Sequence, residues 1–379
     1  MRVRLNECWT TLHEVTHHEV DFRNFAPHLG DVNGYNMIEP PREYRVLLDR
    51  RSSHAPLVTV VVVSFNQSRY LHSTLDSIAA QDCTDFEIVL IDDASQDDST
   101  EVAFTWAQTH SLPIIIVQNT YNRGLVPTLA VATSLVRTPL FSMIAGDDLL
   151  EPRKLSIQIP LLLEAQPTVG YVYSDAHLIS EDGAPVGETW LQFFGPGVQP
   201  KEGALFEAFL LEEFHVPVMT YLIRTDVLRR SGAFGPGLAY EDTDLNLRLS
   251  YQAHARFSDY PSARYRLRPN GLHNTLSPAA LHRSDFRALR PWLRYPRTTR
   301  RRARRKYAIE AYWLYEHHEI GAQQFLSAIR DAPSVETVVL AFLALFHVPM
   351  QSLDSGRARL LRLTRLSRTM CEDRSRGLP

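Results

Sequence analysis

Two kinds of apolar pattern alternate along the middle of the chain. The run Val58–Val63 is apolar at every position but one, which is typical of a strand covered by helices on both faces. In residues 68–81, by contrast, Leu71, Leu75 and Ile78 fall at positions i, i+4 and i+7, the spacing of one apolar stripe on a helix. The first pattern predicts a buried strand and the second an amphipathic helix that packs against it.

The same alternation continues as far as residue 166. Strand-like runs separated by helix-like segments predict parallel strands joined by right-handed helical crossovers. The expected fold is therefore α/β, with a Rossmann-like, mostly parallel sheet flanked by helices. The strand-like runs are 58–63, 86–92, 113–118 and 140–148, and the helix-like segments are 68–81, 98–110 and 154–166.

The character of the sequence changes twice, which divides the chain into three regions. Residues 1–55 are polar and rich in His and Asn, and we expect an N-terminal extension there. Residues 56–278 carry the α/β pattern. Residues 279–379 begin Arg-rich and continue as helical segments, with no Gly/Ser-rich linker before them. We therefore expect a C-terminal helical region packed on the α/β domain, with Val338–Val348 as a core helix too short to span a membrane.

Charge and cysteine content narrow the classes of function. Lys and Arg number 40 against 43 Asp and Glu, so there is no global excess of positive charge to hold nucleic acid. The N-terminus lacks the apolar stretch of a secretory signal. Cys8, Cys83 and Cys371 show no paired metal-ligand spacing. These features predict a cytoplasmic protein with free thiols and no nucleic-acid partner.

Polar side chains follow two of the predicted strands at the point where each strand ends. Ser64 and Asn66 follow the first strand, and Asp92 and Asp93 end the second. Ligands of open α/β sheets bind at this edge. A nucleobase needs donors and acceptors, and a ribose needs a carboxylate for its hydroxyls, so these four side chains are candidates for a nucleotide site. Each type is also a common turn former, which leaves a turn as the alternative.

A second acidic cluster, Gly146-Asp147-Asp148, ends another predicted strand. Adjacent carboxylates repel one another unless a cation or hydrogen-bond donors neutralise them. Mg²⁺ and Mn²⁺ prefer oxygen ligands and are typically held by one or two carboxylates plus substrate phosphates. The cluster therefore predicts a divalent metal site. The alternative is that Asp147 or Asp148 caps the helix expected near Glu151.

A third acidic cluster, Tyr240–Asp244, precedes a helical segment. Asp242 is the candidate general base, whose carboxylate must reach an acceptor hydroxyl. Acids in a first helical turn are also favoured by the helix dipole alone, and that remains an alternative for Glu241 and Asp244.

Five segments, in this order, resemble the inverting GT-A glycosyltransferases of family 2. The resemblance spans residues 56–277 and implies a GT-A fold, a nucleotide-sugar donor linked through uridine or deoxythymidine diphosphate, and Mn²⁺ or Mg²⁺. It also implies an acceptor that is a glycan, a lipid-linked sugar or a protein. The segments are VTVVVVSFNQSRYLHSTLDSI, FEIVLIDDASQDDST, NRGL at 122–125, GDD at 146–148 and YEDTDLNLRLS.

Position by position, the resemblance implies a role for each candidate. Around the nucleotide it implies Ser64, Asn66 and Asp93, with Asp92 beside them. For the metal it implies Asp147 and Asp148, which match the D-x-D region, with Asp147 also near the donor diphosphate. For the catalytic base it implies Asp242, with Glu241 as the alternative. His273 corresponds to a residue that contacts the metal or diphosphate in some relatives.

The sequence departs from the family pattern next to the metal region. Ala145 stands two positions before Asp147, so that fewer acids are available to coordinate a metal. Pro127 stands near the expected start of the helix after NRGL, where proline is tolerated. Arg123, within NRGL, is placed by analogy to meet phosphate oxygens or the acidic cluster.

Two further clusters are candidates for binding. The basic segment Arg297–Lys306 predicts either a peripheral contact with anionic lipid at the inner membrane face or a solvated helix face. His13 and His17 have the i, i+4 spacing of metal ligands, with His18 adjacent, but no third ligand is evident and coincidence is the favoured explanation.

Two other functions remain open at the level of sequence. A nucleotidyltransferase shares the sheet and the metal carboxylates, but it usually needs a Gly-rich phosphate loop, which SFNQSRY does not supply. A catalytically degenerate fold that binds a sugar or a partner is favoured by Ala145. The main prediction is a transferase whose three acidic clusters meet at one edge of the sheet.

Overall fold

The structure is a computed structural model that describes residues 43–211, 215–294 and 297–333. The expected helix at 338–348, the N-terminal histidines and two of the three cysteines lie outside these residues. Cys83 is inside them and is a buried free thiol.

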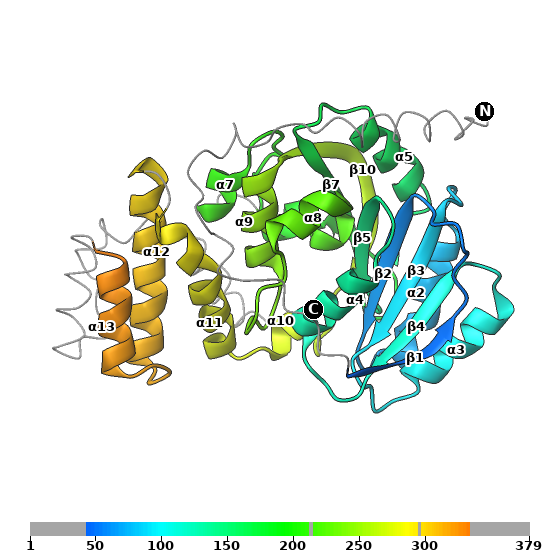
Figure 1. Ribbon diagram of the computed structural model, residues 1–379, viewed down its shortest axis with the longest axis horizontal. Coiled ribbons are helices and arrows are strands. Elements are labelled where there is room, and N and C mark those ends of the chain that lie inside the picture. The colour runs from blue at the N-terminus through cyan, green and yellow to red at the C-terminus, as the bar shows by residue number, and fades with distance from the viewer. Residues whose placement is uncertain (1–42, 212–214, 295–296, 334–379) are drawn as a thin grey trace. The chain divides into compact units, whose positions relative to one another are not determined.

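A ten-stranded mixed sheet runs through the described residues (Figure 1), in the order β1-β4-β3-β2-β5-β9-β7-β10-β6, with β8 paired to β7. Strands β4, β3, β2 and β5 are mutually parallel, and so are β7 and β10, while the other pairings are antiparallel. The expected mostly parallel sheet is confirmed. The strands are β1 Tyr44–Asp49, β2 Val58–Ser64, β3 Phe86–Asp92, β4 Ile114–Asn119, β5 Leu140–Ala145, β6 Leu149–Leu150, β7 Val169–Ile179, β8 Pro185–Thr189, β9 Leu222–Arg224 and β10 His254–Arg266.

Helices follow the parallel strands as the apolar pattern predicts. Figure 1 shows α4 in front of the parallel strands, with α2 and α3 behind them. The α-helices are α2 Ser68–Ala79, α3 Ser99–Thr109, α4 Leu125–Leu135, α5 Lys154–Leu163, α6 Trp190–Phe194, α7 Phe206–Leu210, α8 Thr225–Ser231, α9 Asp242–Gln252, α10 Leu272–Thr275, α11 Pro278–Leu289, α12 Arg297–Glu316 and α13 Ala322–Asp331, and the short 3-10 helices are η3 Val218–Thr220 and η4 Arg290–Arg294.

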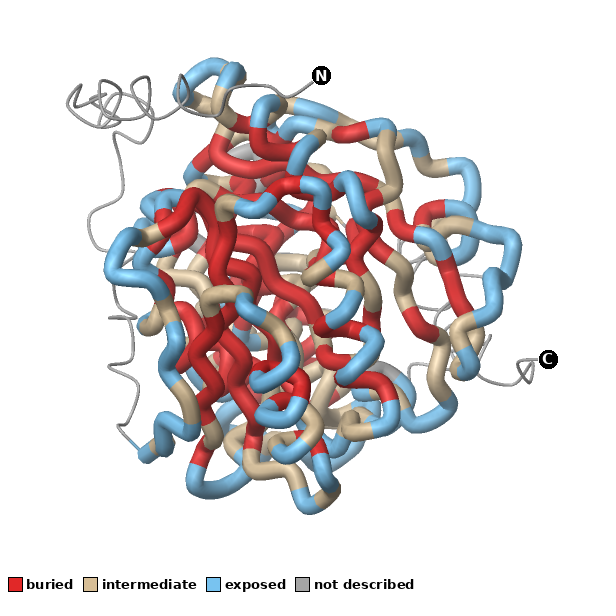
Figure 2. The backbone as a smooth tube through the Cα atoms, turned by 90° about the vertical axis from the view of Figure 1, so that its right-hand side faces the viewer, coloured by how far each residue is buried: buried red, intermediate tan, exposed pale blue. Residues whose placement is uncertain are grey.

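The core lies on both faces of the parallel strands. The predicted stripe of α2, Leu71, Leu75 and Ile78, is completely buried. Every residue of β2 and β3 is buried as well, which accounts for their continuous apolar runs. Figure 2 shows these buried segments as the red interior of the fold.

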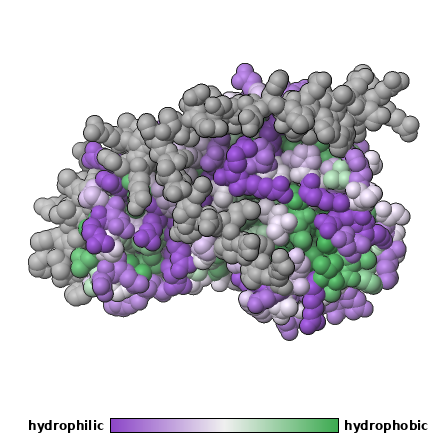
Figure 3. Space-filling view, in the orientation of Figure 1, coloured by the Kyte–Doolittle hydropathy of each residue, from purple (hydrophilic) through white to green (hydrophobic). Residues whose placement is uncertain are grey.

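Strand β1 extends the sheet into the region expected to be an N-terminal extension. It pairs antiparallel with β4 at the sheet edge and leaves Val46 and Leu47 exposed. Figure 3 shows a hydrophobic area over the part of the molecule where β1, β3 and β4 lie. The part of the described chain that joins the sheet therefore begins at Tyr44, before the boundary expected at residue 56.

A polar network stands at the centre of the sheet beside β9. The side chain of Lys154 is completely buried, and its ammonium group donates to Gln158 Oε1 at 2.8 Å and to the carbonyl oxygens of Thr220 and Tyr221 at 2.7 and 3.3 Å. Burial lowers the pKa of Lys154 well below its usual range.

The first C-terminal helices pack on the α/β domain, as the missing linker predicts. Trp292 of η4 stacks edge-on against Phe206 of α7 at 4.9 Å and packs against Tyr251 of α9 at 5.0 Å between ring centroids. Trp292 is 3% exposed. In α12, Arg301 and Arg302 of the basic segment are exposed. The predicted lipid contact of this segment stays a prediction.

Within the residues that the structure describes, no helix has the length and apolar character needed to cross a membrane.

Candidate active site

The carboxyl ends of β3, β2 and β5 lie side by side at one edge of the sheet. Ser64 lies opposite Asp92 in the register of β2 and β3. The backbone N–H of Asp93 donates to the carbonyl oxygen of Ser64 at 2.8 Å, and that of Gly146 to the carbonyl oxygen of Val63 at 2.9 Å. The strand pairing therefore brings the first two polar clusters to a common edge, where α/β folds bind ligands.

The loops after β2 and β3 are hydrogen-bonded to each other. Asp92 is buried and accepts from the backbone and hydroxyl of Ser95, at 2.9 and 2.5 Å, and from the amide of Gln118 at 3.2 Å. Burial raises the pKa of Asp92 despite these bonds. Asn66 has a positive φ of 52°, its N–H donates to Ser95 Oγ, and its Oδ1 accepts from the backbone of Gln96. The hydrogen bonds of Asp92 and Asn66 therefore stabilise the conformation of these two loops.

Asp93 organises the turn that leads into α4. Its carboxylate accepts from the side-chain amide of Asn119 at 2.8 Å and from the backbone N–H groups of Arg123 and Gly124, both at 2.9 Å. Gly124 precedes α4 with φ of 84°, a conformation that favours glycine. The structure therefore gives Asp93 three bonds within the protein, and its contact with a nucleotide stays a prediction.

The side chain of Arg123 is directed toward the start of the sheet. Its Nη2 donates to the carbonyl oxygen of Glu43 at 2.8 Å and to Glu43 Oε2 at 3.3 Å, and its guanidinium lies 4.8 Å from the ring centre of Tyr121. With 4% of its side chain exposed, this arginine is packed in place. Its expected contact with phosphate oxygens stays a prediction.

Two buried acceptors next to Gly146 have no hydrogen-bond partner among the described residues. They are Ser64 Oγ and Gln67 Oε1. A Cβ atom added to Gly146 would lie 2.7 Å from Gln67 Oε1 and 3.4 Å from Ser64 Cβ, so the glycine allows the end of β5 to approach this loop. Buried polar atoms without partners are uncommon in folded proteins and mark places where a ligand or water completes the bonding.

Asp147 and Asp148 are hydrogen-bonded to two arginines, Arg266 at the end of β10 and Arg268 in the loop after it. Asp147 Oδ2 accepts from Arg268 Nη1 at 2.5 Å, and the Asp147 carbonyl accepts from Arg266 Nε at 2.7 Å. Asp148 Oδ1 accepts from the backbone N–H of Arg266 at 2.8 Å. Both guanidinium groups lie 4.9 Å from the ring centre of Tyr70. The arrangement follows from the antiparallel pairing of β6 with β10, which brings the residues beside each strand together.

Arg268 partly neutralises the charge of this pair, and the carboxyl of Asp148 resists ionisation. Asp148 is 4% exposed, and burial first and the neighbouring Asp147 second raise its pKa well above the usual range, despite Arg266 and Arg268. Carboxylate oxygens are ligands that Mg²⁺ and Mn²⁺ prefer, so the donor set fits such an ion. Among the described residues no three His, Cys, Asp or Glu side chains are grouped to hold a metal.

The alternative of helix capping is excluded for these two acids. Helix α5 begins at Lys154, its N-cap is Arg153, and no side chain caps it. His273 lies in α10, but its side chain is outside what the structure describes, so its predicted metal contact stays a prediction.

The three arginines of β10 and the loop after it were not among the sequence candidates. Arg264, Arg266 and Arg268 alternate along the chain, and in a strand this spacing places side chains on one face. Arg264 forms an ion pair with Glu151 at 2.7 Å. Arg266 and Arg268 both donate hydrogen bonds to Asp147. The alternating R-x-R-x-R pattern was the available signal.

Glu241 and Asp242 stand at the N-terminus of α9, where Glu241 is the N-cap residue. Their carboxyl groups are hydrogen-bonded to each other. Burial and the neighbouring Asp242 raise the pKa of Glu241 well above its usual range, and burial raises the pKa of Asp242 to about 6. Asp244, in the first turn of the helix, forms a buried ion pair with Arg248 at 2.8 Å and is structural.

Tyr265 connects the two acidic pairs. Its pKa is raised by burial first, and then by the carboxylates of Asp148, Asp147, Asp242 and Glu241. Its phenol therefore lies within electrostatic range of both the Asp147–Asp148 pair and the Glu241–Asp242 pair. That the second and third acidic clusters meet at one edge of the sheet stays a prediction, which the influence of both pairs on Tyr265 supports.

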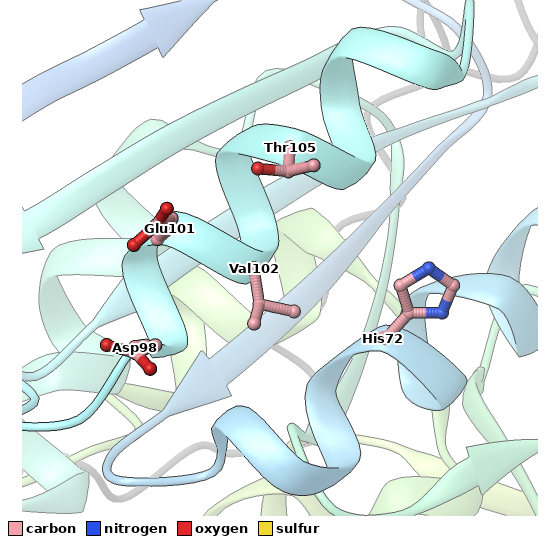
Figure 4. A pocket seen from close by; sticks show the side chains of 5 residues that line it. All are labelled: His72, Asp98, Glu101, Val102 and Thr105. Carbon is pink, nitrogen blue, oxygen red and sulfur yellow. The ribbon is translucent and has the colours of Figure 1, made fainter.

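A separate hollow of about 340 Å³ lies on the outer side of α2 and α3 (Figure 4). It is open to solvent and lined by His72, Asp98, Glu101, Val102 and Thr105. None of these belongs to the acidic clusters, so this hollow is not part of the candidate site.

Comparisons with known proteins identify relatives of this chain. Residues 59–193 match the family model described as Glycosyl transferase family 2. An uncharacterized glycosyltransferase of Rickettsia typhi is 25% identical over 198 residues, which are 52% of this chain and 59% of that protein. The chain thus spans less than two thirds of the length of this curated relative.

Two solved structures share the fold. S. aureus TarS 1–349 in complex with UDP-GlcNAc has a TM-score of 0.53 at 16% identity, covering 85% of this chain and 92% of that one. The mannosyltransferase PcManGT of Pyrobaculum calidifontis, in complex with GDP-Man and Mn²⁺, has a TM-score of 0.52 at 18% identity, covering 87% and 90%.

Proposed function

We propose that this chain transfers a sugar from a nucleotide-sugar donor to an acceptor hydroxyl with inversion at the anomeric carbon. It carries a family 2 glycosyltransferase domain of the GT-A fold. The observation that carries the proposal is the buried Glu241–Asp242 pair at the N-terminus of α9, whose carboxyl groups are hydrogen-bonded to each other and act on Tyr265, as the Asp147–Asp148 pair does. In this proposal the Glu241–Asp242 pair supplies the base, and the Asp147–Asp148 pair binds the donor diphosphate through a cation.

Asp242 is the proposed general base. A pKa of about 6 leaves its carboxylate ionised at neutral pH and makes it a stronger base than an ordinary aspartate. It accepts the proton of the acceptor hydroxyl while the hydroxyl oxygen attacks the anomeric carbon opposite the diphosphate. The bond from that carbon to the diphosphate oxygen breaks, the nucleoside diphosphate leaves with the bonding electrons, and a single displacement inverts the centre.

Asp147 and Asp148 are the proposed ligands of a divalent cation. When bound, Mn²⁺ or Mg²⁺ supplies positive charge that stabilises the diphosphate leaving group. Arg268, which pairs with Asp147 at 2.5 Å, adds a second positive charge beside the proposed cation site. On the other side of the edge, Ser64 Oγ and Gln67 Oε1 offer unpaired acceptors for the donor nucleotide.

A nucleoside diphosphate sugar is the proposed donor class, with uridine or deoxythymidine as the first choice and guanosine as the next. The two structural neighbours, one in complex with UDP-GlcNAc and the other with GDP-Man and Mn²⁺, support this class and the metal. A glycan, a lipid-linked sugar or a protein is the proposed acceptor. The glycosyltransferase family match favours this function over nucleotidyl transfer.

Two variants test the roles of the acids. A screen of nucleotide-sugars, read by release of nucleoside diphosphate, first identifies the donor. Asp242→Asn should then reduce kcat by about 100- to 10,000-fold, the usual contribution of a general base. It should leave the Kd for the donor unchanged in calorimetry. Asp147→Asn should instead weaken binding of uridine diphosphate in the presence of Mn²⁺.

Two outcomes would contradict these assignments. Turnover retained in Asp242→Asn would remove the base assignment, and unchanged Mn²⁺-dependent affinity in Asp147→Asn would remove the metal assignment. Binding without turnover of any donor would instead favour the degenerate binding module.

A further inference from the structure

Helix α11 is hydrogen-bonded to residues 237–239, the segment that leads into the Glu241–Asp242 pair. The backbone N–H of Ala239 donates to Ser284 Oγ at 2.8 Å. The guanidinium of Arg287 donates to the carbonyl oxygen of Gly237. Two residues of successive turns of α11 thus hold the backbone that approaches the acidic pair.

Asp285 lies between Ser284 and Arg287 in α11 and contacts the residues on both sides of the Glu241–Asp242 pair. Tyr240, immediately before the pair, donates its hydroxyl to Asp285 Oδ1 at 2.5 Å. Thr243 immediately follows the pair and donates its hydroxyl to the same oxygen at 2.9 Å. One carboxylate oxygen of α11 therefore brackets the proposed base and its neighbour.

We propose that Asp285 is a positioning residue for the Glu241–Asp242 pair: by accepting the flanking hydroxyls of Tyr240 and Thr243 it fixes the direction of the pair, and it places a further negative charge near the base. The proposal rests on the proposed function of Asp242. It assigns a catalytic contribution to α11, a helix beyond residues 59–193, which match the family.

The electrostatics support this geometry. Burial is the main cause of the raised pKa of Asp242, the hydrogen bond from Glu241 opposes it, and the charge of Asp285 raises it further. Burial raises the pKa of Glu310 on α12, its hydrogen bond with His282 at 2.6 Å opposes this, and the charge of Asp285 raises the pKa further. The groups that face Asp242 are Glu241 on its own helix, Tyr240 before it, Tyr221 before β9, Tyr265 at the end of β10 and Asp285 on α11.

Asp285→Asn separates charge from geometry. The asparagine keeps an oxygen that accepts both hydroxyls, but it removes the negative charge. The acid limb of the pH profile of kcat/KM should therefore move to lower pH by about 0.5 to 1 unit, since one unit charge acts on Asp242 at close range. Asp285→Ala also removes the acceptor and should lower kcat by about tenfold or more with little change in donor KM.

Asp331→Asn is the matched control. It makes the same charge change in the C-terminal helices, on α13, where Asp331 lies 3.8 Å from Arg290. It should leave the acid limb unchanged. A folded Asp285→Asn enzyme with the same acid limb as wild type overturns the proposal.

A second variant covers failure of Asp285→Asn to fold. Thr243→Val removes one hydroxyl donor and leaves every charge in place, so kcat should fall by about 3- to 10-fold with no shift of the acid limb. An unchanged kcat overturns the positioning role.

A titration without substrate distinguishes this proposal from the proposed function. The carboxyl band of Asp242 is followed by difference infrared spectroscopy, wild type minus Asp242→Asn, in the presence and absence of Asp285→Asn. A lower midpoint in the Asp285→Asn background supports the positioning role even if no sugar transfer is found. Sugar transfer by wild type with an unmoved midpoint supports the function and refutes the positioning role.

Discussion

Glu241 and Asp242 are adjacent carboxyl groups that resist ionisation in the folded protein. The pKa of Asp242 is raised to about 6, and that of Glu241 is raised well above its usual range. A carboxyl whose folded pKa lies above its unfolded pKa binds its proton more tightly when folded. It therefore contributes stability below about pH 4, and that stability is lost as pH rises through the folded value.

Replacement of the base should consequently stabilise the protein at neutral pH. A shift of Asp242 from 3.8 to about 6 corresponds to roughly 1 to 3 kcal/mol. Asp242→Asn should raise the free energy of unfolding by up to this amount at pH 7.5, and by much less at pH 4, where the wild-type carboxyl is protonated. Urea unfolding at the two pH values measures the difference.

Asp226→Asn is the comparison, because Asp226 is exposed and pairs with Arg230 on α8. It should change stability little at either pH. An Asp242→Asn protein that is less stable than wild type at pH 7.5 would contradict the destabilising effect assigned to the ionised Asp242 carboxyl.

The candidate acids could be found from the sequence, but their partners could not. Asp147 and Asp242 stand in short motifs, which are local in the chain. Arg268 meets Asp147 only because β6 pairs with β10, more than a hundred residues later. Asp285 meets Tyr240 through the packing of α11, and nothing in either local pattern specifies that helix contact.

At the scale of elements, the close approach of β7 to two helices depends on Gly170. A Cβ atom there would lie 2.4 Å from Ala253 Cβ and 3.0 and 3.1 Å from the Cγ atoms of Val227. These neighbours are short side chains on α8 and at the end of α9, which cannot turn away. Gly170→Ala should therefore lower the free energy of unfolding by about 1 to 3 kcal/mol, the usual cost of overpacking.

Chemical denaturation followed by circular dichroism measures this cost. Gly321→Ser is the matched variant, because a Cβ atom at Gly321 meets nothing within 4 Å and serine is a good N-cap for α13. It should be neutral or slightly stabilising. Equal destabilisation by both variants would show that the contacts of Gly170 are not the cause.

The predictable elements were those with long apolar periodicity. β2 and α2 match the sequence expectation closely because each buries a continuous run or a full stripe. β1 was missed because its sequence YRVLLD lies at the sheet edge and is mostly exposed. β9 has three residues, too few for any period to register.

At the scale of the whole molecule, the C-terminal helices are joined to the α/β domain by aromatic packing. Trp292 bridges Phe206 and Tyr251 at ring-centroid distances of 4.9 and 5.0 Å. Trp292→Ala should lower the free energy of unfolding by about 3 to 5 kcal/mol, as other buried aromatic deletions do. Trp190→Ala, on the partly exposed α6, should cost less.

Guanidinium unfolding of both variants, read by circular dichroism, provides the test. A single transition that moves to lower denaturant in Trp292→Ala is expected. A wild-type-like midpoint for Trp292→Ala would mean that the C-terminal helices do not stabilise the sheet through this contact.

The buried Lys154 has a practical consequence. The sequence contains lysine only at positions 154, 201 and 306. Because Lys154 is completely enclosed and its pKa is depressed, an amine-specific reagent can modify it only after the centre of the sheet separates. The rate of Lys154 acylation, measured by mass spectrometry, would therefore report how often this part of the fold opens, without any engineered label.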